Sequence, residues 1–211
     1  MEASNTGTIT TDSTVKPKTA LLVGDSICAG YYPYVYDELS VKGVVLERQA
    51  VGDSSQLLEF VEKKLNVDDY NLIHFNCGLH DLRVDKTTGN YQQSLQNYKT
   101  NFEKTLSVLI NQPNTIIVFV GITPVIESRH NQKDIKNYSR YLNDVEKYNE
   151  TALSVMKRFG VPSYELCRIL HENDIEKVIC EDGVHMTELG RRLCANVVSG
   201  KIHNLLWPSQ A

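Results

Sequence analysis

The sequence predicts a single α/β domain built on a mostly parallel sheet that helices cover on both faces. The first observation is an alternation, because five short apolar segments are separated by longer segments of helical periodicity. The second is the length of 211 residues, which suits one domain with a substantial core. We place this domain at residues 18–211, after a flexible tail of residues 1–17 that is rich in Ser, Thr and Gly.

The expected strands are short, and two of them are apolar along almost their whole length. These two, residues 20–24 (ALLVG) and 115–121 (TIIVFVG), have the pattern that is typical of strands covered on both faces. The other three are residues 44–48, 71–75 and 161–165. Strands joined through helices run parallel, so functional side chains are expected where their carboxyl ends meet at one edge of the sheet.

Segments between these strands carry apolar residues at spacings of three and four, the pattern of an amphipathic helix. We expect a helix after the first strand, beginning at Ser26, and a last helix beginning near Thr187. The aromatic residues of the helical stripes are expected to face the core. These stripes run through Leu58, Val61 and Leu65; Tyr91, Leu95, Tyr98, Phe102, Leu106 and Leu109; Ile135, Tyr138, Leu142, Val145, Tyr148, Ala152 and Val155; and Leu189, Leu193 and Val197.

Charge and composition limit the partners of the chain. The formal net charge of −4 gives no electrostatic reason to expect a nucleic acid or an anionic membrane. No segment approaches the roughly 20 apolar residues of a membrane-spanning helix. The N-terminal segment lacks the apolar stretch of a secretory signal, so we expect a cytoplasmic protein. The oligomeric state stays open.

Cysteines and histidines form neither a disulfide framework nor a metal-binding motif. The five cysteines are scattered without a CxxC pair, and three lie in apolar runs, which predicts reduced thiols. The six histidines are dispersed and no HExxH motif occurs. We therefore expect no metal and no cofactor.

The motif Gly24-Asp25-Ser26 follows the first strand. Gly24 permits a tight exit from the strand, and Ser26 then stands at the start of a helix. Its backbone N–H is among the unpaired donors of the first turn and can face a developing negative charge. Its side chain is a candidate nucleophile, although a serine at this position is also a good helix cap.

Two further strand ends carry candidate binding groups. Gly52, in the segment QAVGDSS after the second strand, lets the backbone approach a ligand or forms an ordinary turn. His80, in the segment NCGLHD after the third strand, is either a binding group or a loop histidine bonded to a neighbouring backbone group. His74, inside that strand, is expected to be a core histidine.

The segment CEDGVHMT near the C-terminus contains Asp182 and His185, three residues apart. A carboxylate at this spacing can hold the imidazole in the tautomer that leaves its other nitrogen free as a base. A lone DxxH is a weak motif, because both side chains can simply be loop residues. Ser26 changes this balance, since a serine nucleophile needs a positioned base and donors for its oxyanion. The sequence offers both at one edge of the sheet.

Together these residues resemble the SGNH or GDSL hydrolases, a family of esterases, thioesterases, lipases and carbohydrate deacetylases. The first block of the family resembles residues 23–27 (VGDSI), the second-block glycine resembles Gly52, and the last DxxH resembles residues 182–185. The resemblance covers about residues 19–206. It implies a flavodoxin-like three-layer α/β/α fold with about five parallel strands.

The resemblance also implies a role for each matching residue. Ser26 would be the nucleophile, His185 the general base and acid, and Asp182 the residue that orients His185. The backbone N–H groups of Ser26 and Gly52 would line the oxyanion hole. The chain departs from the family at His80, where the third block usually has the asparagine that donates to the oxyanion. A neutral imidazole can replace it if its tautomer is correct, whereas a protonated one would titrate near neutral pH.

The substrate expected from this resemblance is a small-molecule ester, with a short acyl group such as acetyl on a carbohydrate or another small polar carrier. Tyr31, Tyr32 and Tyr34 either line a substrate cleft or pack on the first helix. Arg83 either binds an anionic substrate or is a solvated loop residue. Two other functions remain open: an acyltransferase on the same scaffold, and a binding module with weak catalytic activity.

Overall fold

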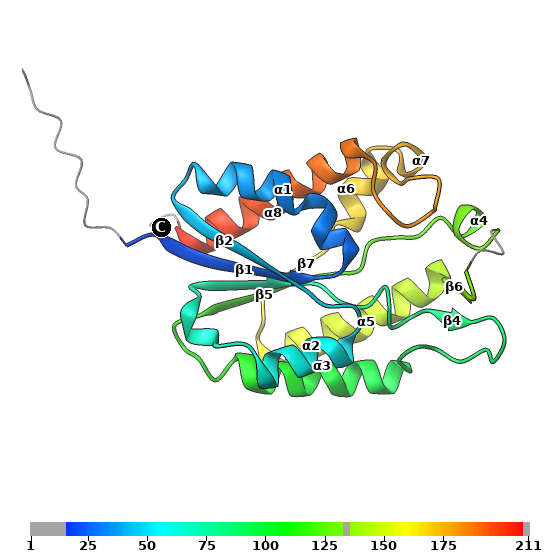
Figure 1. Ribbon diagram of the computed structural model, residues 1–211, viewed down its shortest axis with the longest axis horizontal. Coiled ribbons are helices and arrows are strands. Elements are labelled where there is room, and N and C mark those ends of the chain that lie inside the picture. The colour runs from blue at the N-terminus through cyan, green and yellow to red at the C-terminus, as the bar shows by residue number, and fades with distance from the viewer. Residues whose placement is uncertain (1–15, 133–135, 209–211) are drawn as a thin grey trace, which may run out of the picture.

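A five-stranded parallel sheet forms the centre of the structure, a computed structural model that describes residues 16–132 and 136–208 (Figure 1). Most of the expected tail, residues 1–15, lies outside the described residues. The strands are β1 (Lys18–Gly24), β2 (Val44–Ala50), β3 (Leu72–Phe75), β5 (Ile116–Val120) and β7 (Ser163–Tyr164). Their order, β2-β1-β3-β5-β7, is the flavodoxin-like order, so the expected fold class is confirmed.

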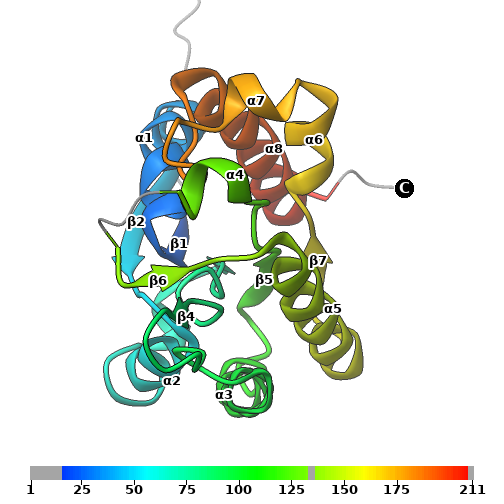
Figure 2. The same cartoon turned by 90° about the vertical axis from the view of Figure 1, so that its right-hand side faces the viewer.

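Helices cover both faces of the sheet, which makes three layers (Figures 1 and 2). One layer contains α1 (Ser26–Ser40), α6 (Cys167–Glu172), α7 (Ile175–Val178) and α8 (Glu188–Leu206). The other contains α2 (Ser54–Lys63), α3 (Leu95–Leu109) and α5 (Leu142–Phe159). Among the described residues, no helix combines the length and the apolarity needed to cross a membrane.

Aromatic side chains fill the core between the sheet and the second helix layer. The ring of Phe75 on β3 lies 5.3 Å from Phe119 on β5 and 6.1 Å from Phe102 on α3, measured between centroids. Tyr98 on α3 lies 5.0 Å from Tyr148 on α5. All five side chains are buried, as the helical stripes predict for Tyr98, Phe102 and Tyr148. Packed aromatic rings of this kind fix α3 and α5 against the strands that carry the site.

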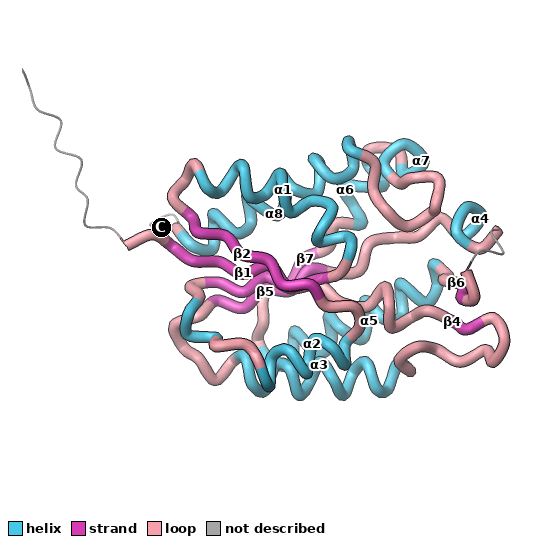
Figure 3. The backbone as a smooth tube through the Cα atoms, in the orientation of Figure 1, coloured by secondary structure: helices cyan, strands magenta, loops and turns pink. Residues whose placement is uncertain are grey.

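The carboxyl ends of the strands share one end of the molecule, and short elements gather there. Figure 3 shows this end with its loops, the helix α4 (Glu127–His130) and a second sheet, in which β4 (Val84–Asp85) pairs antiparallel with β6 (Tyr138–Ser139). A 3₁₀ turn at Val67–Asp69 precedes β3 at the opposite end of that strand. The loops at the carboxyl ends carry the candidate site residues.

Some residues of the expected helical stripes lie outside the helices, because local caps and short strands decide where the helices begin. Helix α3 begins at Leu95, since Ser94 caps it by accepting the Asn97 N–H at 3.2 Å, and Tyr91 instead forms a bridge with Val84. Helix α5 begins at Leu142, and Tyr138 belongs to β6. Ile135 lies outside the described residues, and Leu65 follows the end of α2. The last helix starts one residue after its cap, Thr187, as expected.

Candidate active site

The first strand delivers Ser26 to the carboxyl edge of the sheet with its side chain exposed. Asp25, not Ser26, caps helix α1, because its side chain accepts the Ile27 N–H at 2.9 Å. The alternative that Ser26 serves as the helix cap is therefore wrong. Ser26 is the first residue of the helix, where its own N–H has no partner within the helix.

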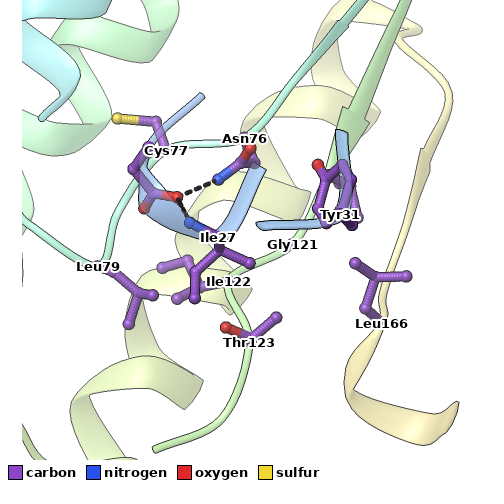
Figure 4. Close-up of a pocket in the computed structure, with 11 residues that line it drawn as sticks. Ile27, Tyr31, Asn76, Cys77, Leu79, Gly121, Ile122, Thr123 and Leu166 are labelled. Carbon is purple, nitrogen blue, oxygen red and sulfur yellow. Dashed lines mark hydrogen bonds between the residues drawn. The ribbon is translucent and has the colours of Figure 1, made fainter. Parts of the chain in front are cut away.

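A buried contact beneath Ser26 fixes this turn. The Asn76 side chain donates to Asp25 at 3.1 Å, and Figure 4 shows Asn76 and Ile27 converging on the same carboxylate. Burial raises the pKa of the Asp25 carboxyl. A Cβ at Gly24 would lie 2.0 Å from the Asn76 Oδ1, so only glycine fits at the end of β1. Asn76, which the sequence analysis did not single out, thus helps to set the position of Ser26.

The loop before α8 brings His185 and Asp182 to Ser26. The His185 Nε2 lies 2.9 Å from the Ser26 Oγ, and its Nδ1 lies 2.5 Å from the Asp182 Oδ2. The other carboxylate oxygen accepts the N–H groups of Val184 and His185 at 3.0 and 2.9 Å. The three side chains form a continuous chain of hydrogen bonds from carboxylate to imidazole to hydroxyl.

The charge state of Asp182 fixes the tautomer of His185. Burial opposes ionisation of this carboxyl, but the His185 side chain and the two backbone N–H groups outweigh it and hold its pKa well below the ordinary value. The carboxylate is therefore ionised at neutral pH and accepts the proton on the His185 Nδ1. The Nε2 is left with a lone pair that faces the Ser26 hydroxyl, which is the arrangement of a general base.

A buried arginine, Arg140, ties this loop to the loop after β3. Its guanidinium donates to the His130 Nε2 at 3.1 Å, so the neutral imidazole carries its proton on Nδ1 and donates to the Asp182 carbonyl at 3.0 Å. Its Nε donates to the Leu79 carbonyl at 2.6 Å, directly before His80. The sequence gives no signal for this connection, because the contacts join segments up to 61 residues apart.

Gly52 and His80 face each other on the other side of Ser26. A Cβ built on Gly52 would lie 3.3 Å from the His80 Nδ1. The Gly52 N–H donates to the Gln56 side chain at 2.8 Å, so this donor has a partner within the protein. Gln56 belongs to the first turn of α2, and its own N–H is capped by Asp53. No motif in the sequence predicted the Gln56 contact.

Arg83 determines which nitrogen of His80 carries the proton. An Arg83 Nη donates to the His80 Nε2 at 3.2 Å, and a guanidinium can only donate, so the neutral ring has its N–H on Nδ1, toward Gly52. Burial, followed by the charges of Arg83 and Arg140, lowers the pKa of His80 to about 4, although Asp53 opposes them. His80 is therefore a neutral donor at pH 7, and it does not titrate near neutral pH.

Tyr31, Tyr32 and Arg83, the candidate substrate-lining residues, have contacts within the protein. Tyr31 is 1% exposed and lines a small cavity of about 10 Å³ beneath the site (Figure 4), so of its two alternatives the structure favours packing inside the protein over an open cleft. Its four-residue spacing from Ile27 and Val35 puts it on the inner face of α1. Tyr32 donates to the Leu46 carbonyl at 3.1 Å. Arg83 stacks on the Tyr138 ring, 4.5 Å from its centroid, besides its bond to His80.

Two open pockets meet at Ser26. One, of about 410 Å³, is lined by Gly52, Gln56, His80 and Arg48 among others. The other, of about 300 Å³, is lined by His185, Met186, Arg191 and Gly30 among others. Because Ser26 lines both, a group bound at its Oγ can extend into either one.

The chain is similar to known proteins in its three-dimensional structure and not in its sequence. No protein-family model and no curated protein sequence matches the chain. Among solved structures, a lipase/acylhydrolase from Enterococcus faecalis aligns with a TM-score of 0.75 at 15% identity, covering 92% of this chain and all of that one. The chain has the fold of this lipase. A GDSL-like lipase from Bacteroides thetaiotaomicron aligns with a TM-score of 0.65 at 20% identity, covering 89% of this chain and 88% of that one.

A third solved structure is a catalytic mutant of an acetylxylan esterase from Geobacillus stearothermophilus. It aligns with a TM-score of 0.66 at 15% identity, covering 88% of this chain and 94% of that one. The fold implied by the resemblance to SGNH or GDSL hydrolases is thus confirmed across nearly the whole described chain.

Proposed function

We propose that the protein is a serine hydrolase that cleaves carboxylic esters through an acyl-enzyme on Ser26. The observation that carries this proposal is the chain of hydrogen bonds from Asp182 through His185 to the Ser26 Oγ, with lengths of 2.5 and 2.9 Å. A serine hydroxyl is a weak nucleophile until a positioned base takes its proton, and here the base and the residue that orients it are both present.

In the proposed reaction, the Ser26 Oγ attacks the ester carbonyl carbon while its proton passes to the His185 Nε2. The tetrahedral oxyanion is stabilised by the N–H groups of Ser26 and Gly52 and by the His80 Nδ1–H. His185 then returns the proton to the leaving alcohol as the C–O bond breaks. Water, activated by the same nitrogen, hydrolyses the acyl-enzyme and regenerates Ser26.

The proposed substrate is an ester of a short acyl group, such as acetyl, on a small polar carrier. Two observations support this choice. Polar and charged side chains line both pockets beside Ser26, Arg48 and His80 in one and Arg191 and His185 in the other, which suits a polar carrier. One of the similar structures is described as an acetylxylan esterase, a protein that acts on an acetylated carbohydrate.

Labelling with a fluorophosphonate probe tests the proposed nucleophile directly. We expect one covalent adduct per chain, located on Ser26 by peptide mapping, together with hydrolysis of 4-nitrophenyl acetate. Release of acetate to water, measured in the presence of competing alcohols, separates a hydrolase from an acyltransferase. A folded protein that takes up no probe and cleaves no ester would be a binding module, and the proposal would then be rejected.

His80→Ala is expected to lower kcat by about 10²-fold with KM nearly unchanged, because the proposed N–H bond forms mainly in the transition state. His80→Asn should recover part of the loss, since its amide can donate from a similar position. Steady-state kinetics on one acetyl ester provide the measurement, with His171→Ala as a control on helix α6, outside the site. Parental kinetics in His80→Ala would remove His80 from the oxyanion hole.

A further inference from the structure

The arginines of this chain fall into two groups that differ in their partners. Four have a carboxylate within ion-pair distance: Arg129 with Glu176, Arg158 with Glu103, Arg168 with Glu172, and Arg192 with Glu188. The other four form no ion pair with a carboxylate in residues 16–132 or 136–208, and all of them lie around the site: Arg48, Arg83, Arg140 and Arg191. Of these four, Arg191 lines a pocket in which neither Asp nor Glu takes part, so its charge there favours an anionic ligand.

Arg191 combines a fixed side chain with available donors and lines a pocket at Ser26. Its Nε donates to the Met186 carbonyl at 2.9 Å, which anchors one side of the guanidinium to the loop of His185. Its stem lies against Gly30, where a built Cβ would be 3.6 Å from the arginine Cδ. The two terminal nitrogens have no hydrogen-bond partner within the described part of the chain. A guanidinium held in this way is prepared for a planar, two-point contact.

The pocket that contains Arg191 is placed for the alcohol part of an ester. It is the pocket of about 300 Å³ that Ser26 and His185 share, and neither Asp nor Glu lines it. In the proposed reaction His185 delivers the proton to the leaving oxygen, so the leaving alcohol departs on the side of His185. A charged group on that alcohol would then lie within the same pocket as the guanidinium.

We propose that Arg191 binds a carboxylate or a phosphate on the alcohol part of the ester, so that the preferred substrates are acylated anions. This inference rests on the proposed function and narrows its substrate class. The carrier would be an acidic sugar or a sugar phosphate in preference to a neutral sugar. The anion binds through paired N–H donors of Arg191, with no carboxylate in the pocket to compete for them.

The test compares three acetyl esters whose carriers differ in the group at one carbon: an O-acetylated neutral hexose, the matching uronate and the matching sugar phosphate. We expect the native protein to have a higher kcat/KM for at least one anionic ester than for the neutral one. Arg191→Gln should reduce that preference by about tenfold or more, the scale for a hydrogen bond to a charged group, mainly through KM. The two anionic arms distinguish carboxylate from phosphate.

Arg192→Gln is the matched control, because it removes the neighbouring charge, which is paired with Glu188 outside the pocket. It should leave the preference intact, and Arg191→Lys should keep part of it. Any damage to the His185 loop affects all three esters equally and cancels in the ratio. A ratio unchanged by Arg191→Gln, or a native preference for the neutral ester, would overturn the inference.

A failure of anion binding by Arg191 can be distinguished from a failure of the proposed hydrolase function. Activity on 4-nitrophenyl acetate, which has no anionic carrier, reports the hydrolase alone. If no ester is cleaved, titration calorimetry of the native protein and Arg191→Gln with the uronate and phosphate esters still decides whether Arg191 binds the anion. Equal binding by the two proteins would reject it.

Discussion

Ser26→Ala is expected to lower kcat/KM for an activated acetyl ester by on the order of 10³-fold or more. The substitution removes the oxygen that forms the acyl-enzyme, and no neighbouring group can replace it. The fold should be unaffected, because the Ser26 side chain bonds only to His185 and the helix cap is provided by Asp25. The measurement is initial rates on 4-nitrophenyl acetate at matched protein concentration.

Circular dichroism and thermal unfolding should show that the Ser26→Ala protein retains its structure. Ser107→Ala is a suitable control, since it removes an exposed serine hydroxyl from helix α3. This hydroxyl bonds only to the Glu103 carbonyl. It is expected to keep full activity. Undiminished hydrolysis by a folded Ser26→Ala protein would show that the acyl group never resides on this serine.

Asp182→Asn is expected to reduce kcat on the order of 10³-fold with little change in KM. An asparagine has nearly the same shape, but its amide can donate to the His185 Nδ1. The proton would then reside on Nε2, and the imidazole could no longer accept the proton of Ser26. The lost interaction concerns the base and not the binding of the substrate, which is why kcat should carry the effect.

Kinetics of the Asp182→Asn protein should be compared with those of Glu181→Gln, which removes an exposed carboxylate from the adjacent position. The control is expected to match the native protein. An NMR measurement of the His185 ring nitrogens would report the change of tautomer independently of activity. A loss of less than about tenfold, with the tautomer unchanged, would show that Ser26 and His185 work as a pair without Asp182.

The part of the site that the sequence could predict is the part made by local motifs at strand ends. Ser26 stands two residues after the end of an apolar strand, and Asp182 and His185 are three residues apart. Their proximity therefore needs only the parallel sheet. Asn76 could also have been predicted as a residue of the site, because it is the first polar residue after β3. The four-residue spacing of Ile27, Tyr31 and Val35 also indicated that Tyr31 lies on the buried face of the first helix.

The rest depends on contacts that no short segment encodes. Arg140 joins the Leu79 carbonyl to His130, and the position of its guanidinium follows from the packing of three separate loops. The two-residue strands β4 and β6 are too short for any periodicity, and so Tyr138 looked like part of a helical stripe. The tautomer of His80 could be assigned only after Arg83 was seen to donate to it.

The hydrogen bond between the Gly52 N–H and Gln56 makes binding at this donor an exchange of partners. The carbonyl oxygen of a substrate is a neutral acceptor, and so is the Gln56 carboxamide oxygen that it must displace. The exchange therefore adds little binding free energy for the ester. On the role proposed for Gly52, the oxyanion is a charged acceptor, and charge-assisted hydrogen bonds are about twice as strong as neutral ones. The oxyanion therefore displaces Gln56 from the Gly52 N–H more favourably than the carbonyl of the bound ester does. This N–H would then stabilise the transition state more than the ground state.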